Sequence, residues 1–292
     1  MRSSSVAPRL AAITDEFSYD LDVALDAMAE VGMTGAELRI VGGRNVIEFD
    51  DDEIARVRAA VARRGMAVVS IASPVLKCVQ PDGPPLDPRV QQDVFGSRSV
   101  FEDQPRLARR AFEIAEQTGA AIVRVFSYWR TNAPARCHDR IVEALSHLAD
   151  EARERGLTVG LENEHGCNVG TAAETAQILE SLDHPALGVT WDPANAYVLG
   201  ETPYPDGYAT LSPHRIVHVH AKDCHVRNQI PTWGPIGTMA IDWAGQIAAL
   251  ARDGYTGWIS LETHWRGDDG LEASRICGRT LHAMMSTARH PR

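Results

Sequence analysis

Four residues that can bind a metal ion stand at the ends of four successive strand-like segments in the second half of the chain. They are Glu162 in LTVGLENEHG, Asp192 in LGVTWDPAN, His220 in IVHVHAKD and Glu262 in WISLETHW. Three carboxylates and one imidazole suit Mn²⁺, Mg²⁺, Fe²⁺ or Co²⁺ better than a structural zinc. Their repeated position predicts one polar centre at the rim of a barrel. We expect it to hold one divalent ion, Mn²⁺ in the first place, with Mg²⁺, Co²⁺, Fe²⁺ or Zn²⁺ as alternatives.

The alternation of side chains along these strands brings further polar groups beside the four. Side chains two residues apart share a face, so His218 and Lys222 point the same way as His220, and His264 follows Glu262. An unpaired charge inside a barrel is costly. The alternative to a metal is a set of buried ion pairs, for which the chain offers basic partners: Arg39, Arg124 and Lys222. Because interior carboxylates outnumber these bases, we favour the metal.

Strand-like and helix-like segments alternate from end to end and must position these residues. Short apolar runs predict eight strands: 9–14, 36–40, 67–73, 121–127, 157–162, 187–192, 216–221 and 258–263. Apolar residues at helical spacing predict seven helices: 20–31, 50–64, 104–118, 138–155, 171–182, 242–253 and 271–287. This order predicts an α/β fold, a single (β/α)₈ TIM barrel over residues 1–292. An open doubly wound sheet is the rival, but no GxGxxG turn follows an early strand.

Two long irregular stretches, 78–103 and 196–214, each follow a predicted strand. In a barrel, the loops after the strands form the catalytic face. We therefore expect these two stretches to cover the site and to select the substrate.

Composition narrows the class of protein. The 292 residues are 44% hydrophobic and 23% charged, as in an ordinary globular protein, and the net charge of −10 disfavours a nucleic-acid partner. Five scattered cysteines without a CxxC pair suit a reducing compartment. We find neither a signal-peptide pattern nor an 18-residue apolar run, so we expect no membrane partner and a cytoplasmic location.

These segments resemble the xylose isomerase-like TIM-barrel superfamily, in particular its sugar phosphate isomerases/epimerases. The resemblance runs from ITDEFSYDLDVALDAMAEVGMTGAELR through SIASPVLK and is strongest in LENEHG, DPAN, HVHAKD and LETHW. It implies that Glu162, Asp192, His220 and Glu262 are the metal ligands. It also implies that Glu162 and Glu262 serve as an acid/base pair, as the two glutamates do in the related ketose 3-epimerases. Family members are often dimers or tetramers, so a homo-oligomer is compatible with the resemblance.

The chain also departs from the ketose 3-epimerase pattern. Glu164 intervenes between Asn163 and His165, and Asn195 stands where those epimerases commonly have histidine. GPIGTM replaces a Gly-Glu-Gly loop, and Val226 occupies a position that often holds arginine. These departures argue against a standard free-ketose 3-epimerase and leave the substrate open.

The predicted chemistry is proton transfer beside a carbonyl group. A divalent ion chelated by a hydroxy-ketone stabilises the enediolate that forms when a neighbouring C–H proton is removed. We predict that Glu162 or Glu262 removes the proton and the other returns it, in an isomerase or epimerase of a sugar, keto-sugar or cyclitol. The runner-up is a lyase that expels a leaving group from the same intermediate, as inosose and dehydroshikimate dehydratases of this superfamily do. A small polyol or keto-sugar is the expected partner, and a slight preference goes to one without phosphate.

Two further functions are less compatible with the sequence. A DNA-repair nuclease of the endonuclease IV type would need a metal site rich in histidine, and the early strands of this chain do not offer enough histidines. The acidic net charge also disfavours binding to DNA. A non-catalytic sugar-binding protein would bind metal weakly and would exchange no proton into its ligand.

Six further residues are candidates for supporting roles. Lys222 and His165 are candidate catalytic residues, the first as a positive charge near a developing oxyanion and the second as a proton carrier. Candidate substrate-binding residues near the predicted rim are Glu16, Lys77, Asn195 and Trp129. Each has a structural alternative: a salt bridge for the charged residues, support of Asp192 for Asn195, and packing for Trp129.

Overall fold

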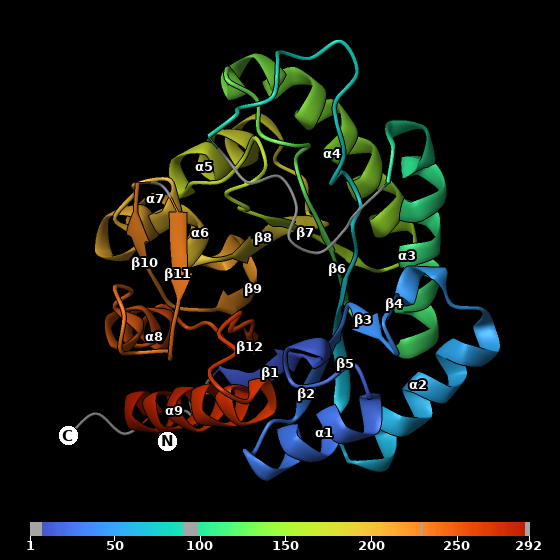
Figure 1. The fold of residues 1–292 in the computed structure, drawn as a ribbon. Helices are drawn as coiled ribbons and strands as arrows, with labels where there is room; N and C mark the ends of the chain where they lie inside the picture. Colours follow the sequence, from blue (N-terminus) through green and yellow to red (C-terminus); the bar gives the residue numbers. More distant parts are fainter. Residues whose placement is uncertain (1–7, 90–98, 229, 290–292) are drawn as a thin grey trace, which may run out of the picture.

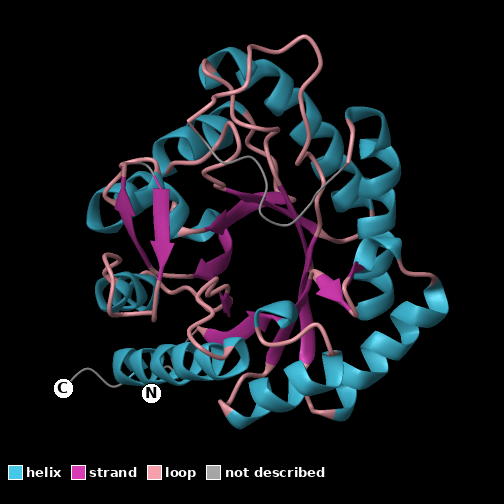
Figure 2. Ribbon diagram, in the orientation of Figure 1, coloured by secondary structure: helices cyan, strands magenta, loops and turns pink. Residues whose placement is uncertain are grey.

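Eight short strands form the barrel and carry most of the residues of the predicted site. They are β1 (Arg9–Ile13), β2 (Gly35–Leu38), β5 (Ala67–Ala72), β6 (Ile122–Val125), β7 (Thr158–Glu162), β8 (Leu187–Trp191), β9 (Ile216–Ala221) and β12 (Trp258–Leu261). In the computed structural model, which describes residues 8–89, 99–228 and 230–289, they close in the order β1-β12-β9-β8-β7-β6-β5-β2. All neighbours pair in parallel (Figures 1 and 2), which confirms the predicted (β/α)₈ barrel.

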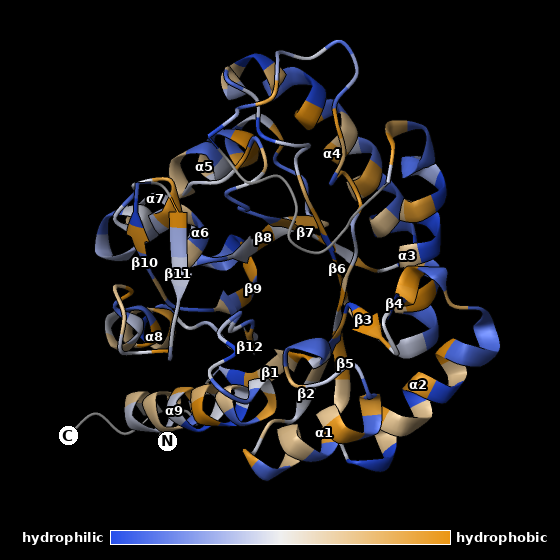
Figure 3. Cartoon of the chain, viewed as in Figure 1, coloured by the Kyte–Doolittle hydropathy of each residue, from blue (hydrophilic) through white to orange (hydrophobic). Residues whose placement is uncertain are grey.

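The seven predicted helices lie around the outside of this barrel. They are α1 (Leu21–Glu30), α2 (Asp51–Arg63), α3 (Gln104–Thr118), α4 (His138–Glu154), α5 (Ala172–Ser181), α8 (Trp243–Arg252) and α9 (Gly270–Arg289). Two of these helices begin at capping residues, since Asp20 accepts a hydrogen bond from the Val23 amide at 3.1 Å and Thr171 forms a capping box with Glu174. In Figure 3, blue and orange segments alternate along these helices, as amphipathic helices require.

Part of the stretch predicted as irregular over 196–214 is helical. It begins within α6 (Pro193–Val198) and contains η5 (Pro203–Gly207) and α7 (Tyr208–Thr210). Helices this short do not show a repeat of apolar spacing that sequence reasoning can detect. Within the other predicted loop, residues 90–98 lie outside the described part of the chain, and a short turn, η3 (Phe101–Asp103), follows them.

Two small hairpins also stand outside the prediction. They are β3 (Ile40–Val41) with β4 (Arg44–Asn45), and β10 (Cys224–Arg227) with β11 (Ile230–Trp233). The predicted strand 36–40 is therefore interrupted at Arg39, whose buried guanidinium group bonds to carboxylates at the rim. The remaining short turns are η1 (Thr14–Glu16), η2 (Val46–Glu48), η4 (Pro134–Cys137) and η6 (Pro213–Arg215).

The outer faces of the strands pack against the helices in a continuous hydrophobic core, whereas the barrel interior is largely polar. Trp191 illustrates the outer face, since its indole is fully buried and donates a hydrogen bond to Gln246 of α8 at 3.0 Å. All five cysteines are buried and free, as expected without a disulfide framework. Within the described ranges, the structure contains no helix with the length and apolar character needed to cross a membrane.

Candidate metal centre

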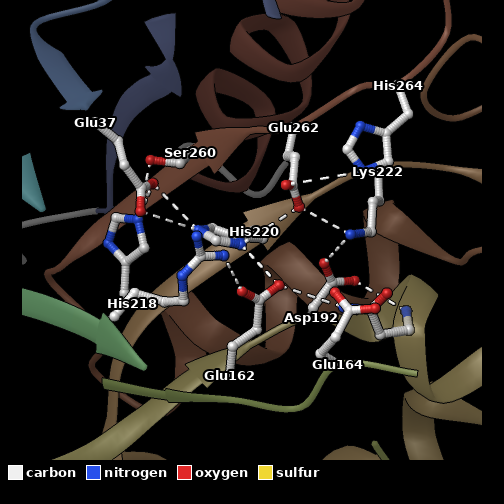
Figure 4. Close-up of polar contacts among 12 residues, drawn as sticks. Glu37, Glu162, Glu164, Asp192, His218, His220, Lys222, Ser260, Glu262 and His264 are labelled. Carbon is white, nitrogen blue, oxygen red and sulfur yellow. Dashed lines mark hydrogen bonds and ion pairs between the residues drawn. The ribbon is translucent and has the colours of Figure 1, made fainter. Parts of the chain in front are cut away.

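The four predicted ligands meet at the carboxyl ends of their strands. Glu162 ends β7, Asp192 directly follows β8, His220 lies on β9 and Glu262 directly follows β12. One ligand atom from each of the four lies within 4.8 Å of the others, and all four residues are buried (Figure 4). Neighbouring parallel strands bring their ends to one rim, which explains how residues spread over a hundred positions converge.

Three buried cations contact these carboxylates directly. Lys222 Nζ lies 2.8 Å from both Asp192 Oδ2 and Glu262 Oε2. Arg124 pairs with Glu162 at 2.5 Å, and Arg39 pairs with Glu262 at 2.7 Å. The ion pairs that formed the alternative to a metal are therefore present.

These cations do not balance the charge of the network. The carboxylates buried in it number six: Asp15, Glu16, Glu37, Glu162, Asp192 and Glu262. The buried Arg and Lys number three: Arg39, Arg124 and Lys222. Formal charges of −6 and +3 leave an excess of three negative charges among these residues, which protonated imidazoles and a divalent cation would offset.

The imidazole of His220 gives a more local reason to expect a cation. Its Nε2 lies 3.1 Å from Glu37 Oε2, and its Nδ1 lies 3.2 Å from Glu162 Oε1 and 3.5 Å from Glu262 Oε2. A neutral imidazole donates from only one nitrogen, so the other would direct a lone pair at carboxylates. Burial alone would lower the pKa of His220, but Glu37 and Glu162 hold it well above its ordinary value. A metal ion on Nδ1 would replace that second proton, so the donor set fits a divalent ion.

A second layer of polar residues lies deeper in the barrel and supports His220. Glu37 on β2 accepts hydrogen bonds from Nε2 of both His220 and His218, the latter at 2.8 Å. His218 Nε2 also lies 3.0 Å from Ser260 Oγ, so this histidine is a hydrogen-bonded residue of the barrel interior. A carboxylate behind a ligand histidine fixes the ring orientation and raises its basicity, which makes Glu37 a positioning residue for the metal centre.

Asp192 is both a candidate ligand and the N-cap of α6. Its Oδ1 accepts a hydrogen bond from the Asn195 amide at 3.0 Å, while Oδ2 faces Lys222. Burial raises the pKa of Asp192 to about 6, although Lys222 opposes this rise. A carboxylate that is incompletely compensated in this way is a suitable ligand for a cation.

Asn195 and His165 connect the centre to the loop after β7. The Asn195 side chain donates to Glu162 Oε1 at 3.3 Å and lies 2.9 Å from His165 Nδ1. His165 Nδ1 also lies 3.0 Å from Glu164 Oε1. Burial lowers the pKa of His165, against the effect of Glu164, so its imidazole is neutral near pH 7. These contacts place both predicted residues beside the ligands, and their roles toward substrate stay predictions.

Glu16 lies on the other side of Glu262, within a network that also contains Asp15. Arg39 donates to Glu16 at 2.8 Å and to both oxygens of Asp15. The backbone amide of His264 donates to Glu16 at 3.0 Å. Glu16 is fully buried and holds Arg39 and His264 beside Glu262, so its predicted contact with substrate stays untested. The sequence did not indicate a role for Asp15, because this residue lies in the turn after β1 and belongs to no repeated pattern.

Lys77 and Trp129 lie together farther out on the rim. The Lys77 ammonium is 4.5 Å from the ring centre of Phe126 and 5.4 Å from that of Trp129. Burial alone would raise the pKa of Glu164, but Lys77 and His165 hold it at about 2. Trp129 is largely buried and packs against Phe126 and Cys167. Their substrate-binding roles stay predictions.

The unpredicted hairpin β10–β11 follows Lys222 and brings Trp233 next to the centre. Trp233 of β11 has its ring 5.6 Å from Lys222 Nζ and 5.1 Å from the His264 ring. Asp223 anchors the hairpin and the segment after it by accepting hydrogen bonds from four backbone amides, those of Cys224, Gly237, Met239 and Ile241. The hairpin is thus fastened at its base, next to Lys222.

Two curated relatives match part of the chain. The 3-dehydroshikimate dehydratase of Pseudomonas putida is 28% identical over 174 residues, covering 57% of this chain and 26% of the relative. The inosose dehydratase of Geobacillus thermodenitrificans is 26% identical over 141 residues, covering 42% and 46%. This chain therefore spans less than half the length of these relatives.

Solved structures match nearly the whole chain at low sequence identity. A Mycobacterium smegmatis xylose isomerase-like TIM barrel protein in complex with magnesium aligns with a TM-score of 0.67 at 19% identity, over 99% of both chains. The 3-keto-D-glucoside 4-epimerase of E. coli aligns with a TM-score of 0.67 at 17% identity, over 94% of this chain and 99% of its own. The IOLI protein with a zinc atom aligns with a TM-score of 0.71 at 14% identity, over 96% and 98%.

These structural likenesses establish a common fold. The sequence profile of the xylose isomerase-like TIM barrel family matches residues 25–280, which is most of the chain and includes all four candidate ligands. The chain therefore belongs to the xylose isomerase-like TIM barrel family.

Proposed function

We propose that this protein is a divalent-metal-dependent isomerase or epimerase of a keto-sugar or keto-cyclitol. The observation that carries the proposal is the convergence of three carboxylates and one imidazole nitrogen of His220 within 4.8 Å of one another. The position of His220 between carboxylates on both sides supports a cation at this point. When bound, the ion would polarise a substrate carbonyl group and stabilise the negative charge that develops as a neighbouring proton leaves.

Glu162 and Glu262 would transfer the proton. Burial alone would raise the pKa of Glu262, but Lys222 and His264 hold it well below its ordinary value. Burial likewise opposes the lowered pKa of Glu162, to which His220 and Arg124 contribute. Both groups are therefore ionised near neutral pH and available as bases. Since they come from strands separated by β8 and β9 in the ring, they can approach a substrate from different sides.

Lys222 would hold positive charge beside the reacting oxygen atoms. Burial alone would lower its pKa, but Asp192 and Glu262 keep it well above the ordinary value. The side chain is therefore an ammonium group throughout the neutral range and suits electrostatic stabilisation better than proton abstraction. His165, with a neutral ring beside Asn195, is the candidate for passing protons between a substrate hydroxyl group and the rim.

The first experiment is elemental analysis after reconstitution with Mn²⁺, for native protein and for the Glu162→Gln/Glu262→Gln variant. We expect about one equivalent in native protein and a large loss in the variant, because two of the three carboxylate ligands lose their charge. The Glu143→Gln/Glu180→Gln variant, which changes two exposed helical glutamates, is the matched control and should bind like native protein. A native protein that takes up no metal would refute the proposal.

A dehydratase is the second candidate function, because the two curated relatives are dehydratases. Both reactions begin by removing a proton beside a carbonyl group, and they diverge when the resulting intermediate either regains a proton or expels a leaving group. Incubation of keto-sugars and keto-cyclitols in D₂O separates them. Uptake of solvent deuterium without loss of water supports the isomerase, whereas formation of an absorbing enone supports the dehydratase.

A further inference from the structure

A cavity of about 480 Å³ lies beside the metal centre, between the loops after β5, β6 and β7, the end of α6 and the β10–β11 hairpin. None of the four candidate ligands lines it. His165 forms part of its wall, and the same ring contacts Asn195, which donates to Glu162. His165 therefore connects the cavity to the candidate metal centre.

The length of helix α6 indicates the distance between the candidate metal centre and the cavity. Asp192 caps its first turn at the centre, while Tyr197, Val198, Leu199 and Gly200 at its other end line the cavity. A helix of six residues is about 9 Å long, at 1.5 Å per residue. The hairpin also reaches both places, since Trp233 lies by Lys222 whereas Val226 and Pro231 line the cavity.

The lining combines apolar and polar residues. Leu199, Val226 and Pro231 contribute apolar surface, while Thr171, Arg89 and Arg130 contribute hydrogen-bonding groups. This combination suits a ring that has C–H groups on its faces and hydroxyl groups at its edge.

The charges of the cavity are already paired. Arg89 donates to both oxygens of Asp87, at 2.9 and 2.7 Å. Arg130 donates to both oxygens of Glu174, at 3.2 and 2.8 Å. Because each guanidinium group has its own carboxylate, the cavity offers hydrogen bonds without a net positive charge and does not favour an anion such as phosphate.

We infer that this cavity is an outer subsite for a second, uncharged sugar ring, so that the substrate is a keto-sugar or keto-cyclitol carrying a glycosyl group. The inference rests on the proposed function, because the reacting part of the substrate would lie at the metal centre. Three of the departures from the free-ketose epimerase pattern lie at or next to this cavity: Val226 lines it, and Glu164 and Asn195 contact His165 of its wall.

Calorimetric titration of the Mn²⁺-treated protein tests the inference with named probes. Fructose is compared with three of its neutral glycosides, lactulose, maltulose and turanose, and with fructose 6-phosphate. We expect at least one disaccharide to bind about tenfold more tightly than fructose, as one well-placed additional ring allows. Equal binding of fructose and all three disaccharides, or tighter binding of fructose 6-phosphate than of any disaccharide, would overturn the inference.

Variants locate the binding in the cavity. Val226→Trp fills it from the hairpin, and we expect the advantage of the disaccharide to fall by about tenfold. His225→Trp is the matched control, because the neighbouring side chain in the strand points to the opposite face and is exposed, so affinity should be retained. Leu199→Trp fills the cavity from α6 and replaces Val226→Trp if that variant is unfolded by circular dichroism.

The metal content of each sample separates this inference from the proposed function. Protein that takes up no Mn²⁺ but still prefers a disaccharide refutes the enzyme and retains the subsite. Protein that takes up Mn²⁺ and shows no preference, or whose preference survives filling of the cavity, refutes the subsite alone.

Discussion

The two halves of the barrel contribute opposite parts of the candidate metal centre. All four candidate ligands come from β7, β8, β9 and β12 or the residues directly after them, whereas β2, β6 and the residue after β2 supply Glu37, Arg124 and Arg39. The second half therefore carries the groups that would bind the ion. The first half carries groups that orient or neutralise them. Loss of a first-half residue should therefore act indirectly, through stability or the orientation of a ligand, whereas loss of a second-half ligand should remove a direct contact with the ion.

Arg124→Met should have the largest effect on stability. It leaves Glu162 buried without its guanidinium partner, and breaking a buried pair in this way costs about 3–5 kcal/mol. Chemical denaturation of metal-free protein measures the loss, and saturating Mn²⁺ should recover part of it. Arg140→Met, which breaks a surface pair with Glu143, should cost less than about 1 kcal/mol. Equal losses for the two variants would remove the proposed role of the first half.

The pH dependence of stability tests the second half through Asp192. Burial raises its pKa from 3.8 to about 6, so the folded protein retains a proton that the unfolded chain has lost. The resulting stability is present below about pH 4 and is lost as the pH rises through about 6. Relative to Asp192→Asn, metal-free native protein should therefore lose at most about 3 kcal/mol between about pH 4 and pH 7.

Unfolding curves at several pH values, with and without Mn²⁺, measure this difference. Bound Mn²⁺ should cancel the loss in native protein, because the ion compensates the ionised carboxylate. Parallel pH profiles for native protein and Asp192→Asn would show that the pKa of the Asp192 carboxyl group is not raised in the folded state.

Glu37→Gln should have a smaller effect, on metal affinity. Replacing a carboxylate behind a ligand histidine typically costs 10- to 100-fold in affinity, roughly 1.4–2.7 kcal/mol. Competition with a chelator measures the change in Mn²⁺ affinity. Glu48→Gln, at an exposed position after β4, is the control. Unchanged affinity in Glu37→Gln would limit this residue to a structural role.

The strands and the four ligands could be predicted because the information is local. Each ligand ends a short apolar run, and β-strand alternation decides which neighbours share its face. Glu37 could be placed on a strand, but not against His220, because 183 residues separate them and only closure of the barrel brings them together. The orientation of the His220 ring could not be predicted for the same reason.

The elements after the strands were harder to predict. Helix α6 contains only six residues, and its proline and asparagine are residue types that predict a loop. Asp192 nevertheless caps the helix. The β10–β11 hairpin contains Pro231, which is uncommon within strands and is tolerated here because the two-stranded sheet has free edges. The cavity between these elements depends on both, so no sequence pattern indicated it.

Asp223 has a consequence for how the family could diversify. Its carboxylate binds the amides on both sides of the hairpin, so the chain leaves the barrel and returns at fixed points. The intervening residues can therefore change in length or composition without displacing Lys222 or the strand that carries His220. The hairpin acts as an exchangeable module, and replacing it is a way to give the same reaction centre a different set of substrates.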